Sequence, residues 1–145
     1  MKPDEYFMRE ALKEAHKAFE KDEVPAGAVI VAADRIIARA HNLTETLNDV
    51  TAHAEMQAIT MAAAFLGGKY MKECTLYVTL EPCLMCAGAL YWAQITRIVY
   101  GAADTKRGFT LNPSSPLHPA TTLTKGILEI ECATLMSDFF KKKRK

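Results

Sequence analysis

The sequence has no run of apolar residues that approaches the ~20 needed for a helix to cross a bilayer. Its first fifteen residues, MKPDEYFMREALKEA, are amphipathic and rich in acids, unlike the basic and then apolar pattern of a secretory signal peptide. Because neither kind of segment is found, we expect a cytoplasmic protein with no membrane partner.

Internal repeats, low-complexity stretches and Pro- or Gly-rich linkers are also missing. Half of the 145 residues are hydrophobic and 24% are charged, as in a folded protein. A chain of this length can bury a sizeable core without disulfides. We therefore expect one domain over residues 1–145, with a basic C-terminal helix or tail at about 132–145.

The net charge of only +1 conceals an uneven distribution. The last five residues, KKKRK, hold five of the eighteen Lys and Arg, which leaves thirteen against seventeen acids and a charge of −4 on the remainder. Such a tail is either a solvated, frayed terminus or a segment that attracts a polyanion such as RNA.

Helix and strand patterns alternate along the chain. Helices are expected at residues 4–19, 52–66, 83–93 and 131–143. Two strands are expected within 24–42, joined as a hairpin at Ala33 and Asp34, and two more at 74–80 and 96–102. A long irregular loop is expected at 103–124, followed by a last strand at 125–130. This alternation predicts a three-layer α/β/α sandwich around a central five-stranded mixed sheet.

Cysteine is scarce, and two of the four cysteines are close together. Cys83 and Cys86 form a C-x-x-C pair where a helix can begin after Pro82, and the positive end of that helix favours thiolates. Alone, the pair fits a metal site, a dithiol redox pair or two small core residues. A further residue type is needed to discriminate among these.

His53 supplies that discrimination, because it also precedes a helix, and in α/β sheets sites collect where strands end and helices begin. One imidazole and two thiolates suit tetrahedral zinc and leave the fourth position for water, as in catalytic sites. A fourth ligand is conceivable from His16, His41, His118, Cys74 or Cys132, but Cys132 fits an apolar helix stripe, Cys74 precedes a strand, and His16 falls on a helix surface. We predict one catalytic zinc per chain.

Glu55 is the candidate for moving protons at that site. Zinc lowers the pKa of water bound to it from near 16 toward ~7, and addition of hydroxide to a ring carbon needs a partner that removes the water proton and returns it. The other reading of Glu55 is a first-turn acid that favours the helix dipole. Its position two residues after His53 favours the catalytic role.

These residues carry a resemblance to a known family. HAE at 53–55 and PCLMC at 82–86 match the H-x-E and P-C-x-x-C signature of zinc nucleobase deaminases. Together with VPAGAVIV, Asn42, TAHAEMQAI, LYVTLEPCLMCAGAL, RIVYGAADTKRG and LMSDFFKKKR, they make nearly the whole chain similar to bacterial tRNA adenosine deaminases of the TadA type, within the cytidine/deoxycytidylate deaminase superfamily.

The resemblance implies a homodimer that binds a tRNA anticodon arm, flips out the wobble adenosine and hydrolyses it to inosine and ammonia. Carried over by position, Asn42 would hydrogen-bond the base or its sugar, and Asp104 and Lys106 would contact neighbouring nucleotides. Phe139, Phe140 and the basic tail would pack on or attract the RNA. On the residues alone, Asn42 could instead cap a loop and the two phenylalanines could belong to the core.

Two features depart from the pattern of the tRNA enzymes. YWAQ at 91–94 contains an aromatic pair like that of the related guanine deaminases, and the loop FTLNPSSPLHPATTL at 109–123 differs from the usual form. The alternatives are therefore a free-base or nucleoside deaminase acting on guanine or cytosine at the same zinc site, and a non-catalytic zinc or RNA-binding protein in which Glu55 is idle.

Overall fold

One mixed five-stranded sheet, in the order β2-β1-β3-β4-β5, organises the chain. The structure, a computed structural model, describes residues 1–144. The strands are β1 (Gly27–Ala32), β2 (Arg35–His41), β3 (Cys74–Leu80), β4 (Arg97–Ala102) and β5 (Thr122–Lys125); the helices are α1 (Asp4–Glu20), α2 (Ala54–Leu66), α3 (Leu84–Ala93) and α4 (Glu129–Lys143), with a short 3₁₀ helix η1 (Phe109–Leu111).

Four of the five strands run in the same direction. Strand β1 is antiparallel to both β2 and β3, whereas β3, β4 and β5 are parallel to one another. Strands β2, β3, β4 and β5 therefore all finish at one edge of the sheet, which we call the carboxyl edge. The segments that follow them leave from this edge, so residues far apart in sequence are brought together there.

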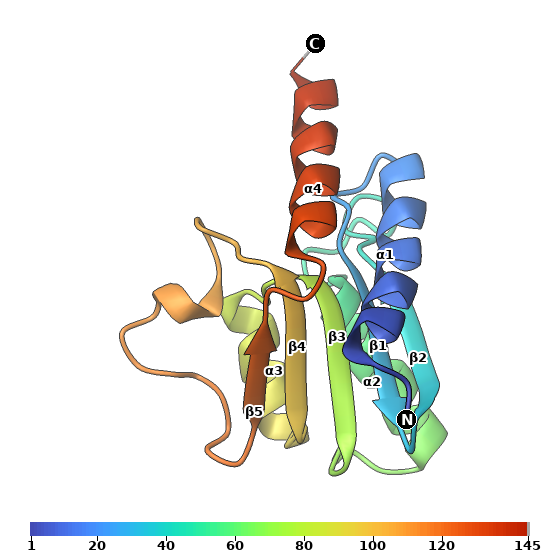
Figure 1. Ribbon diagram of the computed structural model, residues 1–145, viewed down its shortest axis with the longest axis vertical. Helices are drawn as coiled ribbons and strands as arrows, with labels where there is room; N and C mark the ends of the chain where they lie inside the picture. Colours follow the sequence, from blue (N-terminus) through green and yellow to red (C-terminus); the bar gives the residue numbers. More distant parts are fainter. Residues whose placement is uncertain (145) are drawn as a thin grey trace.

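Helices cover both faces of the sheet, which confirms the predicted three-layer sandwich (Figure 1). Helices α2 and α3 lie on one face over a core that includes Ile30, Leu76 and Ile98. Helices α1 and α4 lie on the other face, over Val29 and Val99 among others. Helix α4 projects beyond the carboxyl edge in Figure 1, so the basic end of the chain stands on the side where the strands finish.

Local sequence explains several element ends. Ala33 and Asp34 both have positive φ angles of 50° and 63°, the conformation of a tight hairpin turn, and β1 and β2 pair on either side of them as predicted. Helix α2 ends where Gly67 adopts the left-handed conformation, with φ of 70°, and its N–H bonds back to the Ala63 carbonyl.

The strand predicted at 125–130 is wrong. The last strand is β5, which ends at Lys125, and Glu129 already begins α4. Gly126 and Leu128 have positive φ angles of 85° and 54°, which cannot continue an extended strand. The apolar side chain of Ile127 packs on the α1 and α4 face from a turn, so it shows the apolar pattern of a strand without being in one.

No helix within residues 1–144 combines the length and apolar character that crossing a membrane requires.

Candidate metal centre and active site

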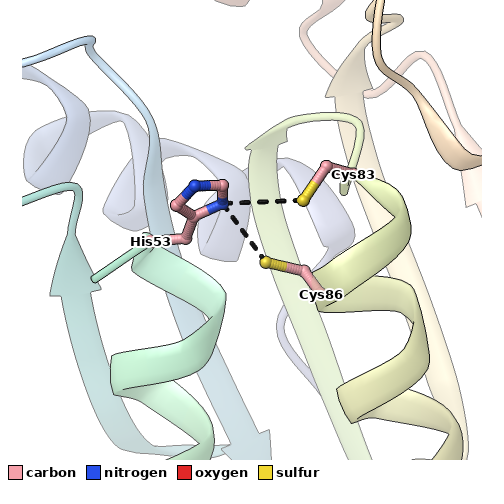
Figure 2. A group of neighbouring side chains, drawn as sticks. All are labelled: His53, Cys83 and Cys86. Carbon is pink, nitrogen blue, oxygen red and sulfur yellow. Dashed lines mark hydrogen bonds between the residues drawn. The ribbon is translucent and has the colours of Figure 1, made fainter. Parts of the chain in front are cut away.

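The prediction that His53, Cys83 and Cys86 converge is confirmed. The His53 Nδ1 atom lies 3.6 Å from the Cys83 Sγ and 3.4 Å from the Cys86 Sγ, and Figure 2 shows the imidazole facing both sulfurs. The three donor atoms all lie within 4.8 Å of one another. The side chains come from the starts of two neighbouring helices that follow β2 and β3, so the carboxyl edge assembles the group.

The helix starts also explain how His53 and Glu55 share one site. His53 is the N-cap of α2, with extended backbone angles of −70° and 156°, so it precedes the helical surface. Glu55 is the second helical residue, and its side chain is buried. The usual separation of side chains two residues apart on a helix therefore does not apply to this pair.

The ionisable groups of the cluster strongly perturb one another. The contacts of Cys86 and His53 with the Cys83 sulfur lower the pKa of Cys83 to about 4, against the opposing effect of burial. The neighbouring Cys83 raises the pKa of Cys86, with burial adding to the effect, and it also raises the pKa of His53. These contacts favour the thiolate form of Cys83, which is the form of cysteine that binds metals.

Burial dominates at Glu55, where it raises the pKa to about 7. The side chain is only 5% exposed, which is unusual for a glutamate and differs from the exposed first-turn acid of the alternative reading. Perturbed carboxyl groups of this kind are concentrated at functional sites.

The donor set fits zinc with an open coordination position. Among the residues that the structure describes, these three are the His, Cys, Asp or Glu side chains grouped closely enough to hold one ion. The other candidates lie elsewhere: Cys74 and Cys132 are buried in the core, His41 contacts Glu14 and Lys21, His118 lies against Tyr91, and His16 is exposed. Three ligands of N and S type are what a catalytic zinc site requires.

Asn42 caps the loop that follows β2. Its Oδ1 accepts the N–H of Thr44 at 3.3 Å, and its Nδ2 donates to the Val24 carbonyl at 3.3 Å. This is the structural role that the sequence left open. Contact of Asn42 with a base or sugar stays a prediction.

Asp104 and Lys106 lie on the loop that follows β4. The Asp104 Oδ1 accepts the N–H groups of Lys106 and Arg107 at 3.0 Å, so this carboxylate shapes its own loop. Lys106 is exposed beside a surface hollow of about 260 Å³, bordered by Leu84 of α3. The hollow places Lys106 next to the helix of Cys83 and Cys86.

The two phenylalanines of α4 differ, and the predicted RNA contact of Phe139 does not fit its burial. Phe139 is 3% exposed and packs against Phe19 with ring centroids 5.9 Å apart, whereas Phe140 is 44% exposed. Near them, Lys143 pairs with Asp22 and Lys142 lies over the Phe19 ring. Part of the basic end is thus held against the protein as helix.

Sequence reasoning missed two buried glutamates at the carboxyl edge. Glu23 accepts the N–H groups of Glu45 and Thr46 at 3.0 and 2.6 Å, and Glu81 accepts hydrogen bonds from the loop after β4. Their sequence context was only a weak signal of this role. Glu23 precedes an apolar segment, Glu81 follows one, and a proline lies within two residues of each.

Comparison with known proteins agrees with this site. A family model described as the cytidine and deoxycytidylate deaminase zinc-binding region matches residues 1–102. The chain is 47% identical over 150 residues to the tRNA-specific adenosine deaminase of Bacillus subtilis (strain 168), and the match covers 100% of this chain and 93% of the relative.

Two solved structures are also similar. One, from biochemical and structural studies of A-to-I editing by tRNA:A34 deaminases at the wobble position of transfer RNA, has a TM-score of 0.82 at 47% identity and covers 90% of this chain and 98% of its own. The guanine deaminase from Bacillus subtilis has a TM-score of 0.69 at 40% identity and covers 72% and 67%. The matched zinc-binding region contains His53, Cys83 and Cys86, and the chain belongs to the cytidine and deoxycytidylate deaminase family.

Proposed function

We propose that this protein is a zinc-dependent tRNA adenosine deaminase, which hydrolyses the wobble adenosine of an anticodon loop to inosine and ammonia. The observation that carries the proposal is the grouping of His53, Cys83 and Cys86 beside the buried Glu55, in a chain similar along its whole length to a tRNA-specific adenosine deaminase. His53, Cys83 and Cys86 would hold the zinc, which supplies Lewis-acid activation of water when bound.

Glu55 moves the protons of the reaction. Hydrolysis replaces the amino group at C6 of adenine with oxygen from water, and the nitrogen leaves as ammonia. We assign to Glu55 the transfer of a proton from the attacking water to the ring nitrogen and then to the leaving group. Its burial keeps bulk water from competing for these protons.

The substrate must present an unstacked base, because C6 is covered while adenine is stacked and paired. The position of two segments at the carboxyl edge supports this proposal: Asn42 follows β2, and Asp104 and Lys106 follow β4. We propose that Asn42 binds the base or its ribose and that Asp104 and Lys106 contact the nucleotides beside it. Phe140, exposed on α4, is the aromatic residue available for stacking.

The decisive experiment is ammonia release by the zinc-loaded protein from an anticodon stem-loop with a wobble adenosine. Free guanine, cytosine and adenosine are assayed in parallel. Turnover of the stem-loop alone supports the proposal. Turnover of a free base alone would overturn the RNA assignment while leaving the zinc chemistry intact.

The second candidate is guanine deamination. It is favoured by the similarity to the guanine deaminase structure and by the exposed aromatic pair Tyr91 and Trp92 on α3. The parallel guanine assay tests it directly. A polymer substrate is preferred because the similarity to the tRNA enzyme extends over the whole chain, C-terminal helix included.

The basic end of α4 is proposed to attract the RNA. Lys141 and Arg144 are exposed, and replacing both with Gln is expected to weaken stem-loop binding about fivefold to tenfold at low salt. The slope of log Kd against log salt should fall by about 1.4, because each charge contributes about 0.7 with single-stranded nucleic acid. Binding is measured by fluorescence anisotropy at several salt concentrations.

The matched control is Lys69→Gln with Lys72→Gln, which removes the same charge beyond the C-terminal end of α2, at the opposite edge of the sheet. Equal weakening by both double variants would contradict a specific role for the basic end of α4.

We further propose a homodimer formed through the outer face of α2 and α3. Large apolar side chains are exposed there, including Phe65 at 69% and Trp92 at 76%, and the two helices contact each other. Unpartnered apolar patches of this kind are typical of interfaces. Trp92→Glu is expected to raise the dimer dissociation constant about a hundredfold in light scattering or sedimentation, with Glu20→Gln as a surface control. A monomeric wild-type protein at high concentration would refute the proposal.

A further inference from the structure

The loop between β4 and η1, residues 103–108, lies directly against the start of the metal-binding helix. The Phe109 N–H at its end donates to the Pro82 carbonyl at 3.0 Å, and Gly108 pairs with Cys83 in an isolated β-bridge. The same loop carries Asp104 and Lys106, the proposed nucleotide contacts. Its position relative to the zinc ligands is therefore set by contacts around residues 81–83.

Glu81 forms the polar contacts that close this loop. Its Oε1 accepts the Asp104 N–H at 3.1 Å, and its Oε2 accepts both the N–H and the hydroxyl of Thr110, at 2.9 and 2.7 Å. One carboxylate thus joins the beginning of the loop to the turn that follows it. The Glu81 N–H donates to the Ala102 carbonyl at 2.8 Å, which ties the backbone of Glu81 to the end of β4 as well.

Two further features indicate that this arrangement is a built one. Glu81 is only 3% exposed, so its carboxylate depends on these donors in place of water. At Gly108, an added Cβ would overlap the Glu81 carboxylate, so a larger residue there would displace the carboxylate from its present position. The glutamate and the glycine are complementary parts of one close contact.

We propose that Glu81 is a positioning residue, which holds the 103–108 loop in its substrate-binding form against the helix of Cys83 and Cys86. The Glu81 carboxylate contacts Asp104 and Thr110, and in this role it acts through Asp104 and Lys106. The claim that the loop contacts nucleotides rests on the proposed function, whereas the claim that Glu81 orders the loop is independent of it.

Glu81→Gln tests this role with little change of volume. A carboxamide keeps one acceptor oxygen but turns an NH₂ group toward at least one of the N–H donors of Asp104 and Thr110. Because hydrogen bonds to a carboxylate are stronger than neutral ones, loop opening should become roughly tenfold to a hundredfold more frequent.

The first measurement uses trypsin, because Lys106 and Arg107 are exposed cleavage sites within the loop. Cleavage of the folded, zinc-loaded protein after either residue is monitored by mass spectrometry. We expect the cleavage rate to rise about tenfold or more in Glu81→Gln, with unchanged zinc content. The matched control, Glu23→Gln, releases the loop at 44–46 and should not accelerate this cut. An unchanged rate in Glu81→Gln would overturn the proposal.

The second measurement separates positioning from general structural damage. The KM for the stem-loop should rise about tenfold in Glu81→Gln, with a much smaller change in kcat, because the zinc ligands and Glu55 keep their places. A loss of kcat at unchanged KM would overturn the positioning role. If wild-type protein does not deaminate the stem-loop, the proposed function fails, and the trypsin result still decides whether Glu81 orders the loop.

Thr110→Val carries the test should Glu81→Gln fail to fold. This substitution removes the Thr110 hydroxyl, which donates a hydrogen bond to the Glu81 Oε2 atom. The rate of cleavage after Lys106 or Arg107 should rise about threefold. No acceleration in this folded variant would also count against the proposal.

Discussion

Replacing Glu55 with Gln is expected to lower deaminase turnover by roughly 10²–10⁴-fold, the range typical for loss of a general acid–base group. The reason is chemical: the carboxamide cannot accept a proton from water and return it to the ring nitrogen and the leaving ammonia. Glu55 is not one of the three grouped donors, so zinc content should stay at that of the wild type.

The stability of Glu55→Gln should distinguish a loss of catalysis from a folding defect. The Glu55 side chain is buried and its pKa is raised by burial, so a neutral side chain of the same size costs little or nothing in free energy of unfolding. Single-turnover rates, zinc content and the thermal midpoint are measured together, with the exposed Glu45→Gln as a control. Wild-type turnover in Glu55→Gln would refute the proton-transfer role.

Loss of the metal has the second large expected effect. Alanine at Cys83, Cys86 or His53 leaves two of the three donors, and the zinc content should fall below about 0.1 per chain after dialysis. Activity should be lost in parallel, since within residues 1–144 no other His, Cys, Asp or Glu belongs to this group of donors. Metal analysis by mass spectrometry, paired with the stem-loop assay, measures both.

Cys74→Ala is the matched control, because Cys74 is also a buried free cysteine but lies in β3 away from the cluster. It should keep one zinc per chain, with at most a modest loss of stability from the smaller core side chain. A full complement of zinc in the Cys86→Ala protein would show that the ligand set is different.

The element order could be predicted from local pattern because helix and strand periodicity depends on neighbouring residues. The predicted hairpin at Ala33 and Asp34 and the predicted helix end at residue 66 are confirmed. The strand predicted at 125–130 failed because the apolar residues Ile127 and Leu128 occur in a turn between β5 and α4. Burial against a distant element produced a strand-like pattern that periodicity cannot distinguish from a strand.

In the candidate site too, some features could be predicted from the sequence and others could not. The chemistry of His53, Cys83 and Cys86 could be predicted because ligand type and spacing restrict the possible metals, and the structure brings the three together. The difference in exposure between Phe139 and Phe140 could not be predicted, because two adjacent aromatic residues at a helix end look alike in sequence. Packing of Phe139 against Phe19 decides which one is exposed.

The sequence by itself determined the order of helices and strands, the residue types of the metal site and the position of Glu55 beside it, because these follow from short motifs and from ligand chemistry. Only the tertiary structure decided how the surrounding loops are held. Glu23 and Glu81 reach N–H groups 22 to 29 residues further along the chain, at the edge where four strands finish. Such contacts arise from the order of strands in the sheet, which no local pattern encodes.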